Sequence, residues 1–331
     1  MTRRRGRRTA LAAGAALATG AVLWTALAGP SRLPQALPPH PARTYEEALD
    51  RFEGLAKRDG PEVNPACRSR LMTHGSRVGR AVVLLHGFTN CPKQFDRIGS
   101  MLHAAGANVL LPRLPRHGLR DRMTEELVRL TGSELLAASA EAVDVAHGLG
   151  DTVVVVGLSS TAVTAAALAQ GRSDLDRAVL LAPALAPKDV PASVARRLAT
   201  LLIHAPNRFA WWNSKEKESL PGPAQCYPRF PTRALGEIYR LGSLVFLTSG
   251  RERPAARSIA IVTTAADRAV GNGVIASLAA RWRARGADVS EYQYAESLGV
   301  QHDMIDPEQV DARVDVAYPV VTALALGRPL P

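Results

Sequence analysis

Short apolar runs alternate with amphipathic segments along most of this chain. The runs have the length of β-strands and lack alternating polar positions, which is typical of strands buried on both faces of a sheet. Segments with helical spacing lie between some of them. This alternation predicts an α/β fold, a mainly parallel sheet with helices on both faces, whose ligands bind beyond the carboxyl ends of the strands. The apolar runs are Ala81–Leu85, Asn108–Leu111, Thr152–Val156, Ala178–Leu181 and Ser258–Thr263, and the helical segments are Tyr45–Lys57, Phe95–Ala105 and Ser133–His147.

The alternation breaks between Ala182 and Arg257, where prolines recur. We expect an inserted helical cap at about residues 186–256, over the carboxyl edge of the sheet. Its aromatic residues Phe209, Trp211 and Trp212 would then contact an apolar part of the substrate. Two alternatives stay open: a helical excursion that only covers the sheet, and aromatic side chains that only anchor the cap to the core.

The first 28 residues have the pattern of an export signal. Several arginines precede the uncharged segment 9–29, and Ala26-Leu27-Ala28 resembles a signal-peptidase site. A stretch of about 20 apolar residues also suits an uncleaved membrane anchor. We therefore expect a protein secreted or held in the periplasm or cell envelope, or alternatively anchored in the membrane through residues 9–29.

Composition and charge fit one large enzyme-sized domain. The chain has 331 residues, of which 47% are hydrophobic and 21% charged. We expect a proline-rich tether and N-terminal extension at 29–75 and the folded domain at 76–331. Nearly half of the net charge of +11 comes from arginines before residue 9, and the remaining arginines are dispersed, which argues against a nucleic-acid partner.

Three cysteines are present, and an oxidising compartment would allow one disulfide. Cys67 and Cys91 flank the first predicted core strand, so we favour that pair. The alternative is three unpaired cysteines in the core, since sequence does not fix connectivity.

The clearest chemical signal is Gly157-Leu158-Ser159 between a valine-rich strand and an alanine-rich helix. In a nucleophile elbow, such a turn exposes the serine hydroxyl and aims the next backbone N–H at the developing oxyanion. Ser159 is then the nucleophile and Ser160 an oxyanion donor. Thr161 stands where the motif has a second glycine, which brings into question whether the turn can form.

A second signal, His86-Gly87-Phe88-Thr89, follows the first core strand. Glycine allows a close backbone approach, so the Phe88 N–H can serve as the second oxyanion donor. We interpret His86 as a structural imidazole.

These segments, together with Pro112–Gly118, resemble the α/β-hydrolase family, in its esterase and lipase-like branch with a small cap. The resemblance covers roughly residues 80 to 310 and implies the chain order serine, acid, histidine. Asp267 follows the last predicted strand and matches the acid. His302 is the only histidine after it and matches the general base.

The resemblance implies a serine hydrolase that cleaves carboxylic esters of short to medium acyl groups or monoacyl lipids through an acyl-enzyme. No cofactor is required, and no metal-binding spacing occurs in the sequence. Two alternatives remain: a catalytically degenerate hydrolase fold acting as an envelope binding protein, and an acyltransferase using the same triad.

Overall fold

The computed structural model describes residue 33 and residues 38–215, 217–220 and 222–331. The expected export segment 1–28 and most of the proline-rich start of the tether lie outside the described residues. In the part of the chain that is described, no helix is both long and apolar enough to cross a bilayer.

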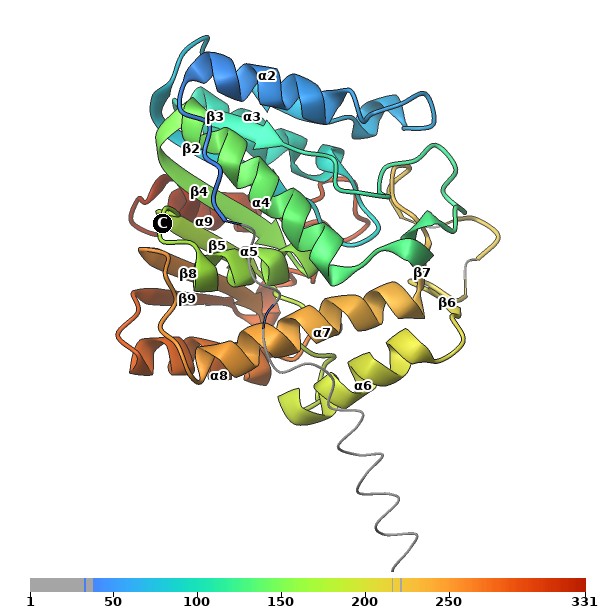
Figure 1. Ribbon diagram of the computed structural model, residues 1–331. Helices are drawn as coiled ribbons and strands as arrows, with labels where there is room; N and C mark the ends of the chain where they lie inside the picture. Colours follow the sequence, from blue (N-terminus) through green and yellow to red (C-terminus); the bar gives the residue numbers. More distant parts are fainter. Residues whose placement is uncertain (1–32, 34–37, 216, 221) are drawn as a thin grey trace, which may run out of the picture.

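One seven-stranded sheet forms the centre of the protein, in the order β1-β3-β2-β4-β5-β8-β9 (Figure 1). Every neighbouring pair is parallel except β1, which runs antiparallel to β3. The mainly parallel sheet predicted from the apolar runs is therefore confirmed. The strands are β1 (Arg70–Met72), β2 (Val78–Leu85), β3 (Asn108–Leu111), β4 (Gly150–Leu158), β5 (Arg177–Leu181), β8 (Ser258–Thr264) and β9 (Val289–Tyr294).

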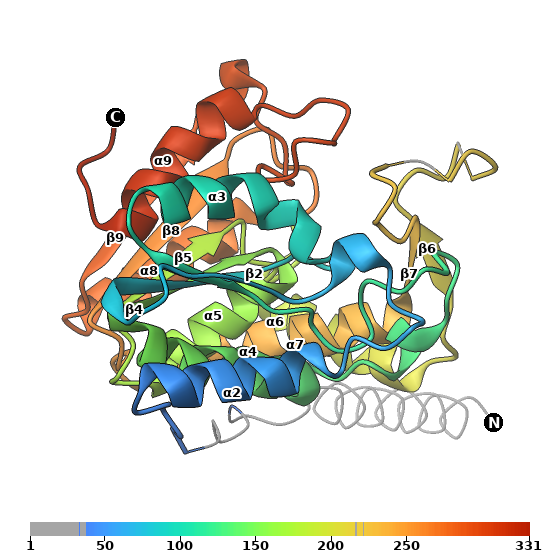
Figure 2. The ribbon, with the colours of Figure 1, turned by 90° about the horizontal axis from the view of Figure 1, so that it is seen from above.

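Helices cover both faces of this sheet (Figure 2). Two of them, α3 and α9, pack on one face, while α4, α5 and α8 lie on the other. The outer helices α2 and α7 pack against α4 and α5, respectively. The helices are α2 (Tyr45–Ala56), α3 (Asp96–Ala104), α4 (Gly132–Leu149), α5 (Ser160–Gly171), α6 (Ala192–His204), α7 (Thr232–Ser249), α8 (Asn272–Ala284) and α9 (Val314–Leu326), with 3₁₀ turns η1 (Pro65–Cys67), η2 (Pro92–Phe95), η3 (Glu126–Arg129) and η4 (Glu296–Leu298).

Local sequence explains where α2 and α4 begin. Thr44 and Thr131 precede the two helices, and each hydroxyl accepts a hydrogen bond from the backbone N–H three residues later. These caps satisfy N–H groups that have no partner inside a helix. In the middle of the sheet, the valines of β4 are almost completely buried and form the centre of the core.

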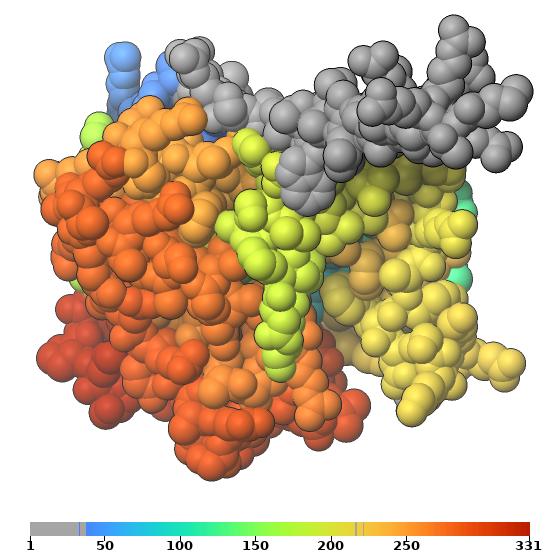
Figure 3. Space-filling view, turned by 90° about the horizontal axis from the view of Figure 1, so that it is seen from below, coloured from blue at the N-terminus to red at the C-terminus, as the bar shows by residue number. Residues whose placement is uncertain are grey.

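The segment between β5 and β8 has two parts. Helices α6 and α7 pack side by side, and α7 continues the helical layer along α5 (Figure 1). A two-stranded antiparallel hairpin, β6 (Phe209–Trp211) and β7 (Arg229–Pro231), lies between these helices in the sequence. In Figure 3 the yellow region around β6 stands apart from the orange and red C-terminal half, with the yellow-green residues leading into α6 between them.

Candidate active site

Ser159 occupies a sharp turn between β4 and α5. Its φ and ψ angles are 59° and −108°, so its backbone lies outside the regions that non-glycine residues normally adopt. The turn is tight because Gly157 lies against the first turn of the helix, where an added Cβ would come within 2.4 Å of the Thr161 carbonyl oxygen. The turn therefore has the backbone geometry expected of a nucleophile elbow.

Thr161 takes part in this turn instead of disrupting it. Its side chain is fully buried, and its Oγ1 accepts a hydrogen bond from the Leu158 N–H at 3.0 Å. The same hydroxyl lies 2.7 Å from the carbonyl oxygen of Leu85, to which it donates. Thr161 thus joins the elbow to the end of β2, a contact that a glycine cannot make.

The structure brings Ser159, His302 and Asp267 into one hydrogen-bonded line. His302 follows β9 and Asp267 follows β8, so both lie beyond the carboxyl ends of neighbouring strands. The Oγ of Ser159 is 2.9 Å from Nε2 of His302, and Nδ1 of His302 is 2.7 Å from Oδ2 of Asp267. Because a carboxylate can only accept, the proton of His302 sits on Nδ1, which leaves Nε2 free to accept the Ser159 hydroxyl proton.

Asp267 is held as a carboxylate. Burial by itself raises the pKa of this group, but the hydrogen bond and charge of His302 outweigh burial and lower it. The N–H groups of Ala269 and Val270 donate to Oδ1 of Asp267 at 2.7 and 3.1 Å and act in the same direction. The aspartate is thereby fixed in position and charge before any substrate binds.

The two expected oxyanion donors are the backbone N–H groups of Ser160 and Phe88. Ser160 is the first residue of α5, where helix geometry leaves the N–H without an intrahelical acceptor. Phe88 lies in the loop after β2 and lines the same cavity as Ser159. Neither N–H donates to another residue in the described portions of the chain.

His86 is a structural residue of this loop. Its side chain is fully buried, and Nε2 accepts the N–H of Leu114 at 3.1 Å, so Nδ1 carries the proton and donates to the Gly87 carbonyl oxygen. Burial, with a contribution from His117, holds the pKa of His86 well below its ordinary value. The His86 imidazole thus ties the loop after β2 to the loop after β3.

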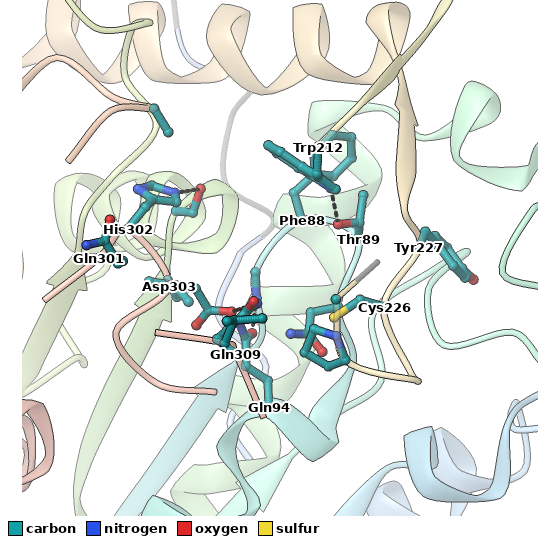
Figure 4. A pocket seen from close by; sticks show the side chains of 18 of the residues that line it. Phe88, Thr89, Gln94, Trp212, Cys226, Tyr227, Gln301, His302, Asp303 and Gln309 are labelled. Atoms are coloured by element: carbon teal, nitrogen blue, oxygen red, sulfur yellow. Dashed lines mark hydrogen bonds between the residues drawn. The ribbon is translucent and has the colours of Figure 1, made fainter. Parts of the chain in front are cut away.

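A cavity of about 610 Å³ opens beside Ser159 and His302 (Figure 4). Phe88, Leu158 and Trp212 contribute apolar surface to it. Trp212 donates from its indole N–H to Oγ1 of Thr89 at 2.9 Å, which fixes the ring beside the loop of Phe88.

Of the three aromatic residues expected to contact substrate, only Trp212 lines this cavity. Phe209 lies under the guanidinium of Arg229, 4.0 Å from its ring centre, and Trp211 lies near the ammonium of Lys217. The reason is the alternation of a strand, since Phe209 and Trp211 share one face of β6 and the following residue turns to the other.

Several polar residues in and behind the cavity wall were not predicted. Gln94 and Gln309 both donate to the carboxylate of Asp303, and the buried amides of Asn90 and Gln225 both donate to Asp306. Burial is the main reason that the pKa of Asp306 rises to about 6. The only sequence signal for this group was the pair of aspartates just after His302.

A disulfide joins Cys67 to Cys91, while Cys226 is free and buried. The bridge connects the N-terminal extension to the loop after β2. In the described part of the protein, no group of three or more histidine, cysteine, aspartate or glutamate side chains has the arrangement of a metal site.

Comparison with known proteins supplies the family. Residues 82–314 match the model of the "Alpha/beta hydrolase family". No curated protein matches the sequence.

Solved structures share the fold at low sequence identity. One, described under "LipS and LipT, two metagenome-derived lipolytic enzymes", is 19% identical with a TM-score of 0.56, covering 80% of this chain and 100% of its own. A monoacylglycerol lipase from Paleococcus ferrophilus is 14% identical, with a TM-score of 0.56 and coverage of 78% and 98%. A soluble variant of monoglyceride lipase from Saccharomyces cerevisiae, solved with a substrate analogue, is 12% identical, with a TM-score of 0.60 and coverage of 78% and 90%. At these identities the similarity shows the fold alone, and the family match over most of the chain leads to one conclusion: the chain belongs to the alpha/beta hydrolase family.

Proposed function

We propose that this protein is a carboxylic ester hydrolase in which Ser159, His302 and Asp267 form a catalytic triad. The observation that carries the proposal is the continuous hydrogen-bonded line from the Ser159 hydroxyl through the imidazole of His302 to the Asp267 carboxylate. That line provides a nucleophile, a base in the correct tautomer and a buried anion that stabilises the imidazolium.

The reaction proceeds in two halves. Ser159 Oγ attacks the ester carbonyl carbon while Nε2 of His302 takes its proton, and the resulting oxyanion accepts hydrogen bonds from the Phe88 and Ser160 N–H groups. The imidazolium then returns the proton to the leaving alcohol. A water molecule deprotonated by His302 attacks the acyl-enzyme in the same way and releases the acid.

The substrate class we propose is esters of short to medium acyl groups, including monoacyl lipids. The apolar wall of Phe88, Leu158 and Trp212 suits an acyl or alkyl chain, and the amide-rich opposite wall suits a polar alcohol. Two of the structures that share the fold are described as monoacylglycerol or monoglyceride lipases. The β6–β7 hairpin that carries Trp212 would act as the cap over this pocket.

We also propose that the protein works outside the cytosol, exported or anchored by its N-terminal segment. A disulfide in the folded domain suits an oxidising compartment. Fractionation of cells that produce the full chain, with sequencing of the mature N-terminus, tests export and separates cleavage from anchoring. A protein confined to the cytosol with its disulfide reduced would contradict this proposal.

The function is tested with a serine-reactive fluorophosphonate and a panel of esters of graded acyl length. Wild type should be labelled by the fluorophosphonate and should hydrolyse the esters, whereas Ser159→Ala should do neither. The matched control is Ser173→Ala, which replaces an exposed serine beyond the other end of α5. His302→Ala should lose several orders of magnitude in kcat, with exposed His204→Ala as its control. Labelling of Ser159→Ala at the wild-type level would refute the assignment. Product analysis with added glycerol separates hydrolysis from acyl transfer.

A further inference from the structure

The side chain of Gln94 connects two loops of the candidate site. Gln94 lies in η2 and is only 2% exposed. Its Oε1 accepts the backbone N–H of Gly87 at 2.7 Å, and its Nε2 donates to Oδ2 of Asp303 at 2.9 Å. Figure 4 shows Gln94, Asp303 and Gln309 gathered on one side of the cavity, away from Trp212.

The orientation of this amide follows from its partners. A backbone N–H only donates and a carboxylate only accepts, so the oxygen of Gln94 must face Gly87 and its nitrogen must face Asp303. Reversing the amide would place two donors together on one side and two acceptors together on the other. The bridge therefore has a fixed direction that a carboxylate at position 94 cannot reproduce.

Each end of the bridge adjoins a residue of the proposed reaction. Gly87 precedes Phe88, whose N–H is the expected oxyanion donor, and Asp303 follows His302. Asp303 is itself anchored within the histidine loop, because its Oδ1 accepts the N–H groups of Ile305 and Asp306 at 3.3 and 3.1 Å. A displacement at either end of Gln94 would therefore reach the other loop.

We infer that Gln94 is a positioning residue, which holds the Phe88 N–H and the His302 imidazole at a fixed distance from each other around Ser159. The inference rests on the proposed hydrolase function. It has a kinetic consequence, because an oxyanion donor and a general base must be in place at the same moment, and a displacement of about 1 Å at such a site costs on the order of 100-fold in rate.

A charge exchange tests this role. In Gln94→Glu the new carboxylate still accepts from Gly87 but faces the carboxylate of Asp303. In Asp303→Asn the new amide instead directs a donor at the amide nitrogen of Gln94. Each single variant should lower kcat by about 10- to 100-fold with little change in KM, because the displacement affects the transition state more than ground-state binding.

The double variant Gln94→Glu/Asp303→Asn should recover most of the lost kcat. There the new amide donates to the new carboxylate, so the bridge is rebuilt with its second hydrogen bond reversed and with the total charge unchanged. Gln309 can adapt by turning its own amide, since it is only partly buried. Rescue by the reversed pair is a readout that general destabilisation does not produce.

The matched control is Gln170→Glu. Gln170 is also buried and also bridges two segments, accepting from the Trp282 indole N–H and donating to the Glu252 carbonyl oxygen, but it lies at the opposite end of α5 from Ser159. This variant should lower the melting temperature and leave kcat per active site unchanged. All rates are normalised to active sites titrated with the fluorophosphonate.

The outcomes separate the two proposals. Single variants with wild-type kcat, or a double variant no faster than the slower single variant, would overturn the positioning role while wild type still hydrolyses esters. A wild-type protein that neither labels nor hydrolyses would overturn the proposed function, and with it this inference.

Discussion

Replacing Thr161 by valine should lower the free energy of unfolding by about 2–6 kcal/mol. Valine has nearly the shape of threonine, so the change removes the hydroxyl and little else. The Leu158 N–H then loses the acceptor that it has at 3.0 Å, and the Leu85 carbonyl oxygen loses its donor at 2.7 Å. A buried polar group left without its partner costs about 1–3 kcal/mol, and two such groups are affected.

Serine and glycine at position 161 separate the hydroxyl from the methyl group. Thr161→Ser keeps both hydrogen bonds and loses one buried methyl group, which costs about 1 kcal/mol. Thr161→Gly restores the usual glycine of the motif, yet it loses both hydrogen bonds and adds the cost of glycine in a helix, about 1 kcal/mol. It should be at least as unstable as Thr161→Val.

Urea unfolding followed by tryptophan fluorescence measures these differences, with the disulfide kept oxidised in all samples. A Thr161→Val variant as stable as wild type would show that the hydroxyl contributes nothing. A Thr161→Gly variant more stable than wild type would show that threonine strains the elbow. Either result would refute a stabilising role for the Thr161 hydroxyl in this turn.

Three further predictions concern the triad, the disulfide and a buried acid. Asp267→Asn should lower kcat by about 10³- to 10⁴-fold, because an amide favours the wrong tautomer of His302; unchanged turnover in a steady-state ester assay would remove Asp267 from the triad. Replacing Cys67 and Cys91 together by alanine should lower the free energy of unfolding by about 3 kcal/mol for a bridge across 24 residues, and equal urea midpoints would contradict this. Burial raises the pKa of Asp306 to about 6, above its value of about 4 in an unfolded chain. The native state therefore keeps this proton to higher pH, so the contribution of Asp306 to stability is full below about pH 4 and is lost as the pH rises through about 6. As the pH rises from about 4 to about 6, the free energy of unfolding of Asp306→Asn should increase relative to that of wild type by up to about 3 kcal/mol. A difference in stability between the two proteins that does not change with pH would exclude this linkage.

The central strands were predictable because a strand buried on both faces needs a continuous apolar run. The runs assigned to β2, β3, β4, β5 and β8 agree with the structure within a few residues. The edge strands β1 and β9 were missed, since an edge strand exposes polar side chains and its pattern loses the apolar continuity. Residues Val289–Tyr294, for example, include only two buried residues, one at each end of the strand.

The site was predictable only where chemistry follows a motif in chain order. Ser159 was predicted from the motif and Asp267 and His302 from the chain order of the family, and the structure places His302 within hydrogen-bond distance of both Ser159 and Asp267. Gln94 gave no such signal, because its partner Asp303 lies 209 residues away and nothing local requires an amide there. The hydrogen bond that Thr161 donates could not be predicted for the same reason, since its acceptor belongs to another strand.

The loop from Leu85 to Cys91 explains how the expected oxyanion donor is held. Almost every residue of this loop is fixed by a contact with another segment of the chain, whereas the Phe88 N–H has no acceptor within the described residues. The partners are the Thr161 hydroxyl for Leu85, the Leu114 N–H for His86, the Gln94 amide for Gly87, the Trp212 indole for Thr89, the Asp306 carboxylate for Asn90 and the Cys67 sulfur for Cys91. A donor fixed in this way needs no reorganisation when charge develops on the substrate, which is the condition under which oxyanion stabilisation is largest. The family motif therefore predicts the donor, whereas the contacts that hold it come from residues that no local pattern connects to it.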